Sequence, residues 1–185
     1  NGATTNQDNT GTGTIVGYAN GLWKTADTLL KSDSGYSLEG SPTEIKVAQN
    51  LTMVSDKGIA YYADNGGLIN VNSATTTAKG YGSVIGYASG TGTSGTSTKK
   101  STVNFSGAIT ADDSISSPLA KKITEKYTNI GAYAKNGGVV NVTGKATING
   151  IGGFADNGEV NLLNTDNIFA SLFSTFCVTV CFRLG

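Results

Sequence analysis

The sequence predicts an all-β protein, a parallel β-helix with coils of about 22 residues and short loop and helical inserts. A strand–turn–strand module that returns along the chain is the main reason. The composition agrees, since 26 glycines, only 2 prolines and many Thr, Ser and Asn residues are typical of short strands joined by tight turns. The formal net charge is zero and only 14% of residues are charged, so we expect no nucleic-acid partner.

The module is clearest at residues 58–71, 129–142 and 150–162, with weaker copies at 15–21 and 84–90. Its aromatic anchors are separated by 44, 25, 46 and 21 residues, which indicates one unit of about 22 residues with two skipped copies. The anchors are Tyr18, Tyr62, Tyr87, Tyr133 and Phe154.

The first strand of each module carries an aliphatic residue three positions before the aromatic and an alanine directly after it. These two positions share parity, so on a regular strand both face the core and the aromatic faces outward. The aliphatic residues expected inside are Ile15, Ile59, Val84, Ile130 and Ile151.

The corner and the second strand follow in the order that a stacked coil needs. Asn-Gly-Gly or Asn-Gly-Glu supplies residues that tolerate positive φ at a sharp turn. The next strand alternates apolar residues with asparagine, so a ladder of asparagines is expected outside when coils stack. The asparagines are Asn70, Asn104, Asn141 and Asn161. A β-sandwich is the alternative, but it gives no reason for near-identical corners.

We divide the chain into a flexible or partial segment at 1–12 and a repeat body at 13–164. Two inserts interrupt the body. Residues 90–101 are rich in Gly, Thr and Ser and predict a flexible polar loop. The second insert covers about 110–128, and within it the spacing of apolar residues after a proline predicts a short helix over 117–127.

The tail, residues 165–185, differs in character from the repeats. It holds four of the six phenylalanines, both cysteines (Cys177 and Cys181) and the only arginine. A terminal cap is one interpretation, but a solenoid cap needs a polar outer face and this segment is apolar. We therefore favour the interpretation that the tail is out of frame.

Few residues in the chain suit catalysis. Histidine is absent and no cysteine precedes Cys177, which argues against a nucleophilic triad or a zinc site. Asp112-Asp113 is the only adjacent pair of acids, and it is typical of a turn before a helix. Asp64 and Asp156 share one repeat position with Lys135, which indicates a solvated corner. We expect no enzymatic activity, no cofactor and no metal.

The aromatic anchors are the feature with binding potential. Stacked along one wall, the side chains of Tyr18, Tyr62, Tyr87, Tyr133 and Phe154 can simply shield the sheet and fix its register. The functional hypothesis is an exposed ribbon that contacts a sugar or a protein.

The modules at 58–71, 129–142 and 150–162, with their Tyr-Ala-x-Asn-Gly-Gly-x-Val-Asn-Val pattern, resemble the passenger domains of autotransporters. These are surface proteins that Gram-negative bacteria export by type V secretion. The resemblance covers about residues 13–164. It implies a right-handed β-helix outside the cell, followed in the full-length parent by an outer-membrane barrel that this chain lacks. It also implies adhesion, co-aggregation or virulence.

Two functions therefore remain open. The first is a structural and adhesive stalk that attaches to a host or bacterial surface protein or glycan. The second is part of a carbohydrate-active β-helix whose catalytic coils lie outside this chain, because paired carboxylates alone can hydrolyse glycosides.

Overall fold

The computed structural model describes residues 5–7, 13–21, 43–94, 97–111 and 129–164, and every regular element within them is a β-strand. The helix expected at 117–127 and the tail at 165–185 lie outside the described residues, as does most of the segment 1–12.

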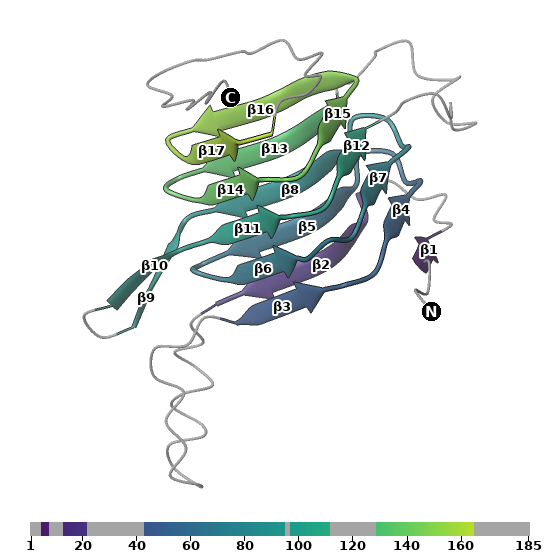
Figure 1. Cartoon of the computed structure of the whole chain (residues 1–185). Coiled ribbons are helices and arrows are strands. Elements are labelled where there is room, and N and C mark those ends of the chain that lie inside the picture. The colour runs from purple at the N-terminus through teal and green to yellow at the C-terminus, as the bar shows by residue number, and fades with distance from the viewer. Residues whose placement is uncertain (1–4, 8–12, 22–42, 95–96, 112–128, 165–185) are drawn as a thin grey trace, which may run out of the picture.

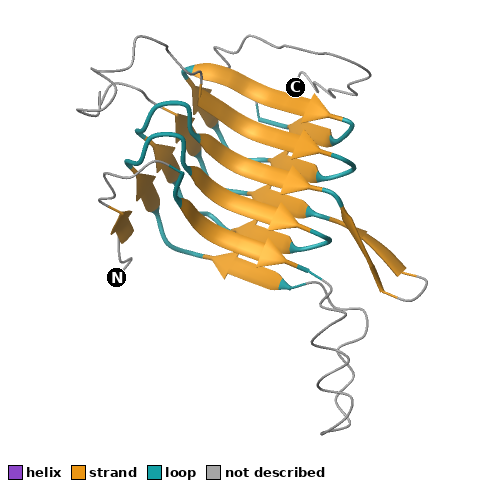
Figure 2. Cartoon of the chain, turned by 180° about the vertical axis from the view of Figure 1, so that it is seen from behind, coloured by secondary structure: helices purple, strands orange, loops and turns teal. Residues whose placement is uncertain are grey.

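Fifteen of the strands form three parallel sheets of five, which we name after the residues on their outer faces (Figures 1 and 2). The threonine sheet contains β1 (Thr5–Gln7), β4 (Leu51–Met53), β7 (Thr76–Ala78), β12 (Ile109–Ala111) and β15 (Ala146–Ile148). The aromatic sheet contains β2 (Ile15–Asn20), β5 (Ile59–Asp64), β8 (Val84–Ser89), β13 (Asn129–Lys135) and β16 (Gly150–Asp156). The asparagine sheet contains β3 (Glu44–Val47), β6 (Leu68–Val71), β11 (Thr102–Phe105), β14 (Val139–Val142) and β17 (Glu159–Leu162).

The chain visits the three sheets in a fixed order, from the aromatic sheet to the asparagine sheet to the threonine sheet (Figure 1). We call one such passage a circuit; β5, β6 and β7 make up one circuit, and β8 begins the next. Successive circuits pair in register, so that Ile69, Val103 and Val140 lie directly above one another. Like residues therefore form columns that run across the strands.

The core lies between the sheets and joins residues from all three into one hydrophobic cluster. From the asparagine sheet it takes the two apolar residues that flank the asparagine in β6, β11, β14 and β17, as the alternation in the sequence predicts. Phe105 is the largest side chain that is fully buried. The threonine sheet turns its middle residues outward, at Thr52, Thr77, Thr110 and Thr147.

The Asn-Gly corners between the aromatic and asparagine sheets have the backbone conformation that the sequence predicts. Asn65, Asn136 and Asn157 have φ of 50°, 51° and 52°. Asparagine accepts this left-handed region more readily than most residues do. The next glycine continues the turn, with φ of 84° at Gly66 and 85° at Gly137.

The aliphatic residues of the aromatic sheet do not lie inside, so that expectation is wrong. Ile15 is 45% exposed. Its counterparts Ile59, Val84, Ile130 and Ile151 are only partly buried. The reason is that two consecutive residues are both buried in β5, β8, β13 and β16, such as Ala60 and Tyr61 in β5. Strict alternation is broken there, which places the preceding aliphatic residue on the outer face.

The insert at 90–101 also differs from the expected flexible loop. It forms an antiparallel hairpin of β9 (Thr91–Ser94) and β10 (Ser97–Lys100), which projects from the corner between two sheets (Figure 2). Threonine-rich strands and a two-residue connection that begins with glycine suit such a hairpin. At the base of the hairpin the amide N–H of Gly66 donates to the Ser101 hydroxyl, with a nitrogen–oxygen distance of 2.9 Å.

Candidate functional site

The structure brings all five aromatic anchors together in one column on the outer face of the aromatic sheet, which we call the aromatic column. Strand register places Tyr18, Tyr62, Tyr87, Tyr133 and Phe154 above one another. Consecutive ring centroids are 5.1, 4.7, 4.8 and 5.0 Å apart in that order. This spacing follows from the distance between hydrogen-bonded strands, so the sheet itself holds the rings in contact.

The rings differ in how they meet. Tyr62 and Tyr87 are stacked with an angle of 15° between their planes, and Tyr87 and Tyr133 are stacked at 25°. The two ends are less parallel, at 42° for Tyr18 against Tyr62 and 74° for Tyr133 against Phe154. The flat faces of the middle rings are covered by their neighbours. A partner approaching the middle of the column therefore meets ring edges and hydroxyl groups.

Tyr18 is the most open member, with 47% of its surface exposed. Its hydroxyl accepts a hydrogen bond from the side-chain amide of Asn20 at 2.9 Å. Asn20 stands two residues further along the same strand, at the register position that Asp64 occupies in the next circuit. A polar column thus runs beside the aromatic column and consists of Asn20, Asp64, Ser89, Lys135 and Asp156.

Two tyrosines of the aromatic column, Tyr62 and Tyr133, have raised pKa values. Burial is the main cause that raises the pKa of Tyr62 to about 12, and the nearby Asp64 carboxylate adds to it. Burial raises the pKa of Tyr133 as well, with smaller contributions from Tyr87 and Asp156. A phenol that is partly desolvated and close to other anions resists losing its proton. These tyrosines therefore remain neutral hydrogen-bond donors well above neutral pH.

An aliphatic column lies on the same outer face, three positions before the aromatic column. It consists of Ile15, Ile59, Val84, Ile130 and Ile151. Sequence reasoning assigned these residues to the core, because it assumed unbroken alternation. The two columns together form an apolar outer face five strands wide, which is a larger surface than the aromatic residues alone provide.

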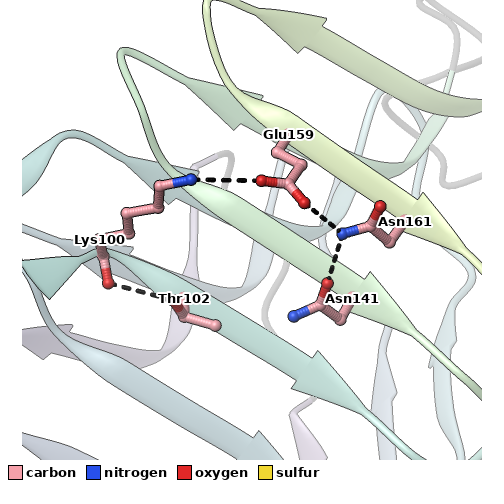
Figure 3. A network of polar contacts seen from close by, with 5 residues as sticks. All are labelled: Lys100, Thr102, Asn141, Glu159 and Asn161. Atoms are coloured by element: carbon pink, nitrogen blue, oxygen red, sulfur yellow. Dashed lines mark hydrogen bonds and ion pairs between the residues drawn. The ribbon is translucent and has the colours of Figure 1, made fainter. Parts of the chain in front are cut away.

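The asparagine sheet presents a hydrogen-bonded ladder of side-chain amides, and Figure 3 shows its step from Asn161 to Asn141. The amide nitrogen of Asn104 donates to Asn70 at 2.7 Å, that of Asn141 to Asn104 at 2.7 Å, and that of Asn161 to Asn141 at 2.8 Å. A glutamate accepts at each end, since Asn70 donates to Glu44 at 2.8 Å and Asn161 also donates to Glu159 at 2.9 Å. The predicted asparagine ladder is confirmed, and its amides are occupied with one another.

Lys100 ties the hairpin to this ladder (Figure 3). Its ammonium nitrogen lies 3.3 Å from a carboxylate oxygen of Glu159, two circuits further along the chain. The hydrogen bond from Asn161 is the largest cause that lowers the pKa of Glu159, and the contact with Lys100 comes next. Both side chains are substantially exposed, at 58% and 44%, so the pair contributes little to stability by itself.

The acidic residues that the sequence singled out do not gather. Asp64 and Asp156 occupy one column with Lys135 between them, and Lys135 lies 3.9 Å from Asp156. Asp112 and Asp113 lie outside the described residues. Within the described ranges, no three His, Cys, Asp or Glu side chains are grouped so as to hold a metal ion. In the same ranges no helix has the length and hydrophobicity of a membrane span.

Comparison with known proteins adds no relative. No protein-family model matches the sequence, and no curated protein or solved structure matches it either.

Proposed function

We propose that the chain is a segment of a right-handed parallel β-helix of about 22-residue coils that serves as a structural and adhesive stalk. We assign it to the passenger part of an autotransporter on the surface of a Gram-negative bacterium. Adhesion would take place on the outer face of the aromatic sheet. The observation that carries this proposal is the aromatic column, which stays on the outside through five circuits beside the aliphatic column.

The architecture supports a stalk. Three sheets that repeat in register extend in one direction only, and each circuit depends on its neighbours to bury its apolar residues. Such a stack can lengthen by adding circuits while its outer columns stay straight. An extended row of like side chains suits attachment to a large surface, because many weak contacts act together.

The arrangement of the rings indicates how a partner would be held. Since neighbouring rings cover the faces of Tyr62, Tyr87 and Tyr133, a sugar cannot stack flat on the middle of the column. The partner instead meets a row of phenol hydroxyls next to the polar column and the aliphatic column. A protein surface or a glycan that accepts hydrogen bonds fits this pattern.

Adhesion is tested by immobilising the full chain and measuring its binding to bacterial cells, host extracellular-matrix proteins and a glycan array. The variant carries Tyr62→Thr, Tyr87→Thr and Tyr133→Thr, which keep β-branched residues on the strands. A matched control carries Thr77→Ser and Thr110→Ser on the threonine sheet, and circular dichroism verifies that both fold. We expect the tyrosine variant to lose binding and the control to retain it. Equal binding by both variants would refute adhesion through this face.

Surface display is tested separately. The full chain is placed between a signal peptide and an outer-membrane autotransporter barrel in a Gram-negative host. We expect the chain to become accessible to protease on intact cells, because a cysteine-free repeat body can be exported unfolded. Retention of the chain inside the cell envelope would contradict the assignment to a passenger.

A further inference from the structure

The aromatic column contains four tyrosines in consecutive contact, followed by Phe154. Each tyrosine belongs to a different circuit, so each contact joins segments that are distant in sequence. Tyr62 and Tyr87 are 25 residues apart (87 − 62), and Tyr87 and Tyr133 are 46 apart (133 − 87). A covalent bond between two such rings would tie two circuits together.

We propose that the aromatic column is a site of oxidative cross-linking, where hydrogen peroxide and a haem peroxidase join tyrosines of successive circuits as dityrosine. Each phenol gives up one electron and its hydroxyl proton and becomes a tyrosyl radical. The two radicals couple through a carbon–carbon bond between the ring positions next to the hydroxyl groups. Each of these carbons then passes its hydrogen to the ring oxygen, which restores both phenols. The peroxide takes up the two electrons and two protons and becomes two molecules of water.

The geometry favours coupling within one molecule. The centroids of Tyr62, Tyr87 and Tyr133 are separated by 4.7 and 4.8 Å, and the sheet keeps them in register. The rings lie on the outer face, where the oxidised peroxidase can reach their edges. A radical formed on one ring has its partner at a very high effective concentration, whereas a second molecule must arrive by diffusion.

Two carboxylates of the polar column, Asp64 and Asp156, can receive protons that the oxidation releases. The Asp64 carboxylate is hydrogen-bonded to the Tyr62 side chain. Removal of an electron makes a phenol strongly acidic, so a carboxylate within hydrogen-bond reach accepts the proton directly. The Asp156 carboxylate acts on Tyr133 through its charge and not through a hydrogen bond. Both ends of the stacked trio therefore have a carboxylate nearby.

Two aromatic residues of the chain serve as internal references. Tyr61 is the sequence neighbour of Tyr62, but it is only 2% exposed and its ring meets Phe105 instead of another tyrosine, at 5.8 Å. Phe154 continues the column without a hydroxyl group, so the sequence of cross-links must stop at Tyr133. Cross-linking is thus expected at three contacts: Tyr18 with Tyr62, Tyr62 with Tyr87, and Tyr87 with Tyr133.

The experiment uses the full chain in dilute solution with hydrogen peroxide and a haem peroxidase. To isolate the column, Tyr36, Tyr81 and Tyr127 are replaced by phenylalanine. This leaves the four column tyrosines and the buried Tyr61. We expect the fluorescence of dityrosine, a mass lower by two hydrogen atoms for each bond formed, and a product that remains monomeric on a denaturing gel. Peptide mapping should find bonds between neighbouring members of the column.

The decisive variant adds Tyr87→Phe. Phenylalanine keeps an aromatic ring in the stack, but it has no phenol and cannot form dityrosine. Since Tyr87 belongs to two of the three contacts, the yield of intramolecular dityrosine should fall at least twofold. The control adds Tyr61→Phe and should leave the yield unchanged. Oxidised wild-type monomer should also unfold at a higher urea concentration than the untreated chain, because the bonds restrict the unfolded state.

Three results would overturn the proposal. One is dityrosine that forms only between molecules and rises with protein concentration. Another is an intramolecular yield that Tyr87→Phe does not change. The third is a cross-linked monomer whose urea midpoint equals that of the untreated chain, since that would exclude a bond between circuits.

Discussion

Gly86 and Phe105 offer a sharp test of how the core is packed. A methyl group added to Gly86 would lie 2.6 Å from Cε2 and 3.1 Å from Cζ of Phe105, and 3.2 Å from Cγ1 of Val140. The Phe105 ring cannot swing away easily, because it is 1% exposed and the Tyr61 ring lies 5.8 Å from it. The glycine therefore makes room for the Phe105 ring.

We expect Gly86→Ala to destabilise the protein despite the better strand propensity of alanine. Overpacking a core costs about 1–3 kcal/mol. Replacing glycine by alanine also lowers the conformational entropy of the unfolded chain, which stabilises the folded protein by only about 0.4–1 kcal/mol. The net cost should be about 1–2 kcal/mol. Phe105→Leu is also destabilising on its own, because it leaves part of the ring volume empty.

The two substitutions should be less harmful together than the sum of their separate effects. Leucine removes the ring atoms that the new methyl group meets, so the pair should recover about 1 kcal/mol or more, within the range for residues in contact. Urea unfolding of the wild type, both single variants and the double variant measures this coupling free energy. Additivity within about 0.5 kcal/mol would refute the packing described for Gly86 and Phe105.

Three further predictions concern the ladder, a corner and the response to pH. Asn104→Leu breaks two amide hydrogen bonds on a half-buried face. It should lower the free energy of unfolding in urea by about 1–3 kcal/mol. The exposed control Asn72→Ala should change this free energy by less than about 0.5 kcal/mol. Gly144→Ala places a methyl group against the backbone carbonyl oxygen of Gly107 in the preceding circuit. Since backbone cannot move aside as a side chain can, this variant should yield little soluble folded protein in an expression and gel-filtration comparison. The folded-state pKa of Tyr62 is raised from 10.0 to about 12. The contribution of Tyr62 to folding stability is therefore fully present below pH 10 and is lost as the pH rises toward 12. Stability should therefore fall over that range, and Tyr62→Phe should reduce the slope in urea unfolding followed against pH; an unchanged slope would contradict the shifted pKa.

Much of the fold can be predicted from the sequence because its repeats carry local and periodic information. The corner asparagines Asn65, Asn136 and Asn157 indicate the left-handed conformation directly. The asparagine ladder follows from simple alternation in strands of four residues. The aromatic column follows from its position beside alanines that are buried in every circuit. None of these inferences requires knowledge of distant contacts.

The errors arise where position in the sequence does not determine the direction of a side chain. Ile59 and Ala63 share parity, yet only Ala63 is fully buried, because Ala60 and Tyr61 both turn inward between them. The same break recurs at Gly86, Ala132 and Gly153, the residues that occupy the register position of Tyr61 in later circuits, and a parity argument cannot detect it. The hairpin at 91–100 could not be predicted from the sequence for another reason. Its residues are typical of loops and of exposed strands alike, and the pairing of the two strands decides between them.

The candidate site was predictable in its members and not in its geometry. The sequence identifies the five aromatic residues and their common face. It does not show that the middle rings cover one another, since this depends on side-chain rotation. It also gives no sign of the adjoining aliphatic column, for the reason given above for Ile59.

The in-register columns make the protein unequally tolerant of changes in length. Removing or duplicating a whole circuit between β5 and β17 would leave asparagine against asparagine and aromatic against aromatic, because these circuits carry the same residue types at those two positions. Loss of one residue within a strand would instead move every later side chain of that strand to the opposite face. Related chains should therefore differ in length by multiples of a circuit, or by insertions at corners such as the one that carries the hairpin, and only rarely by single residues within strands.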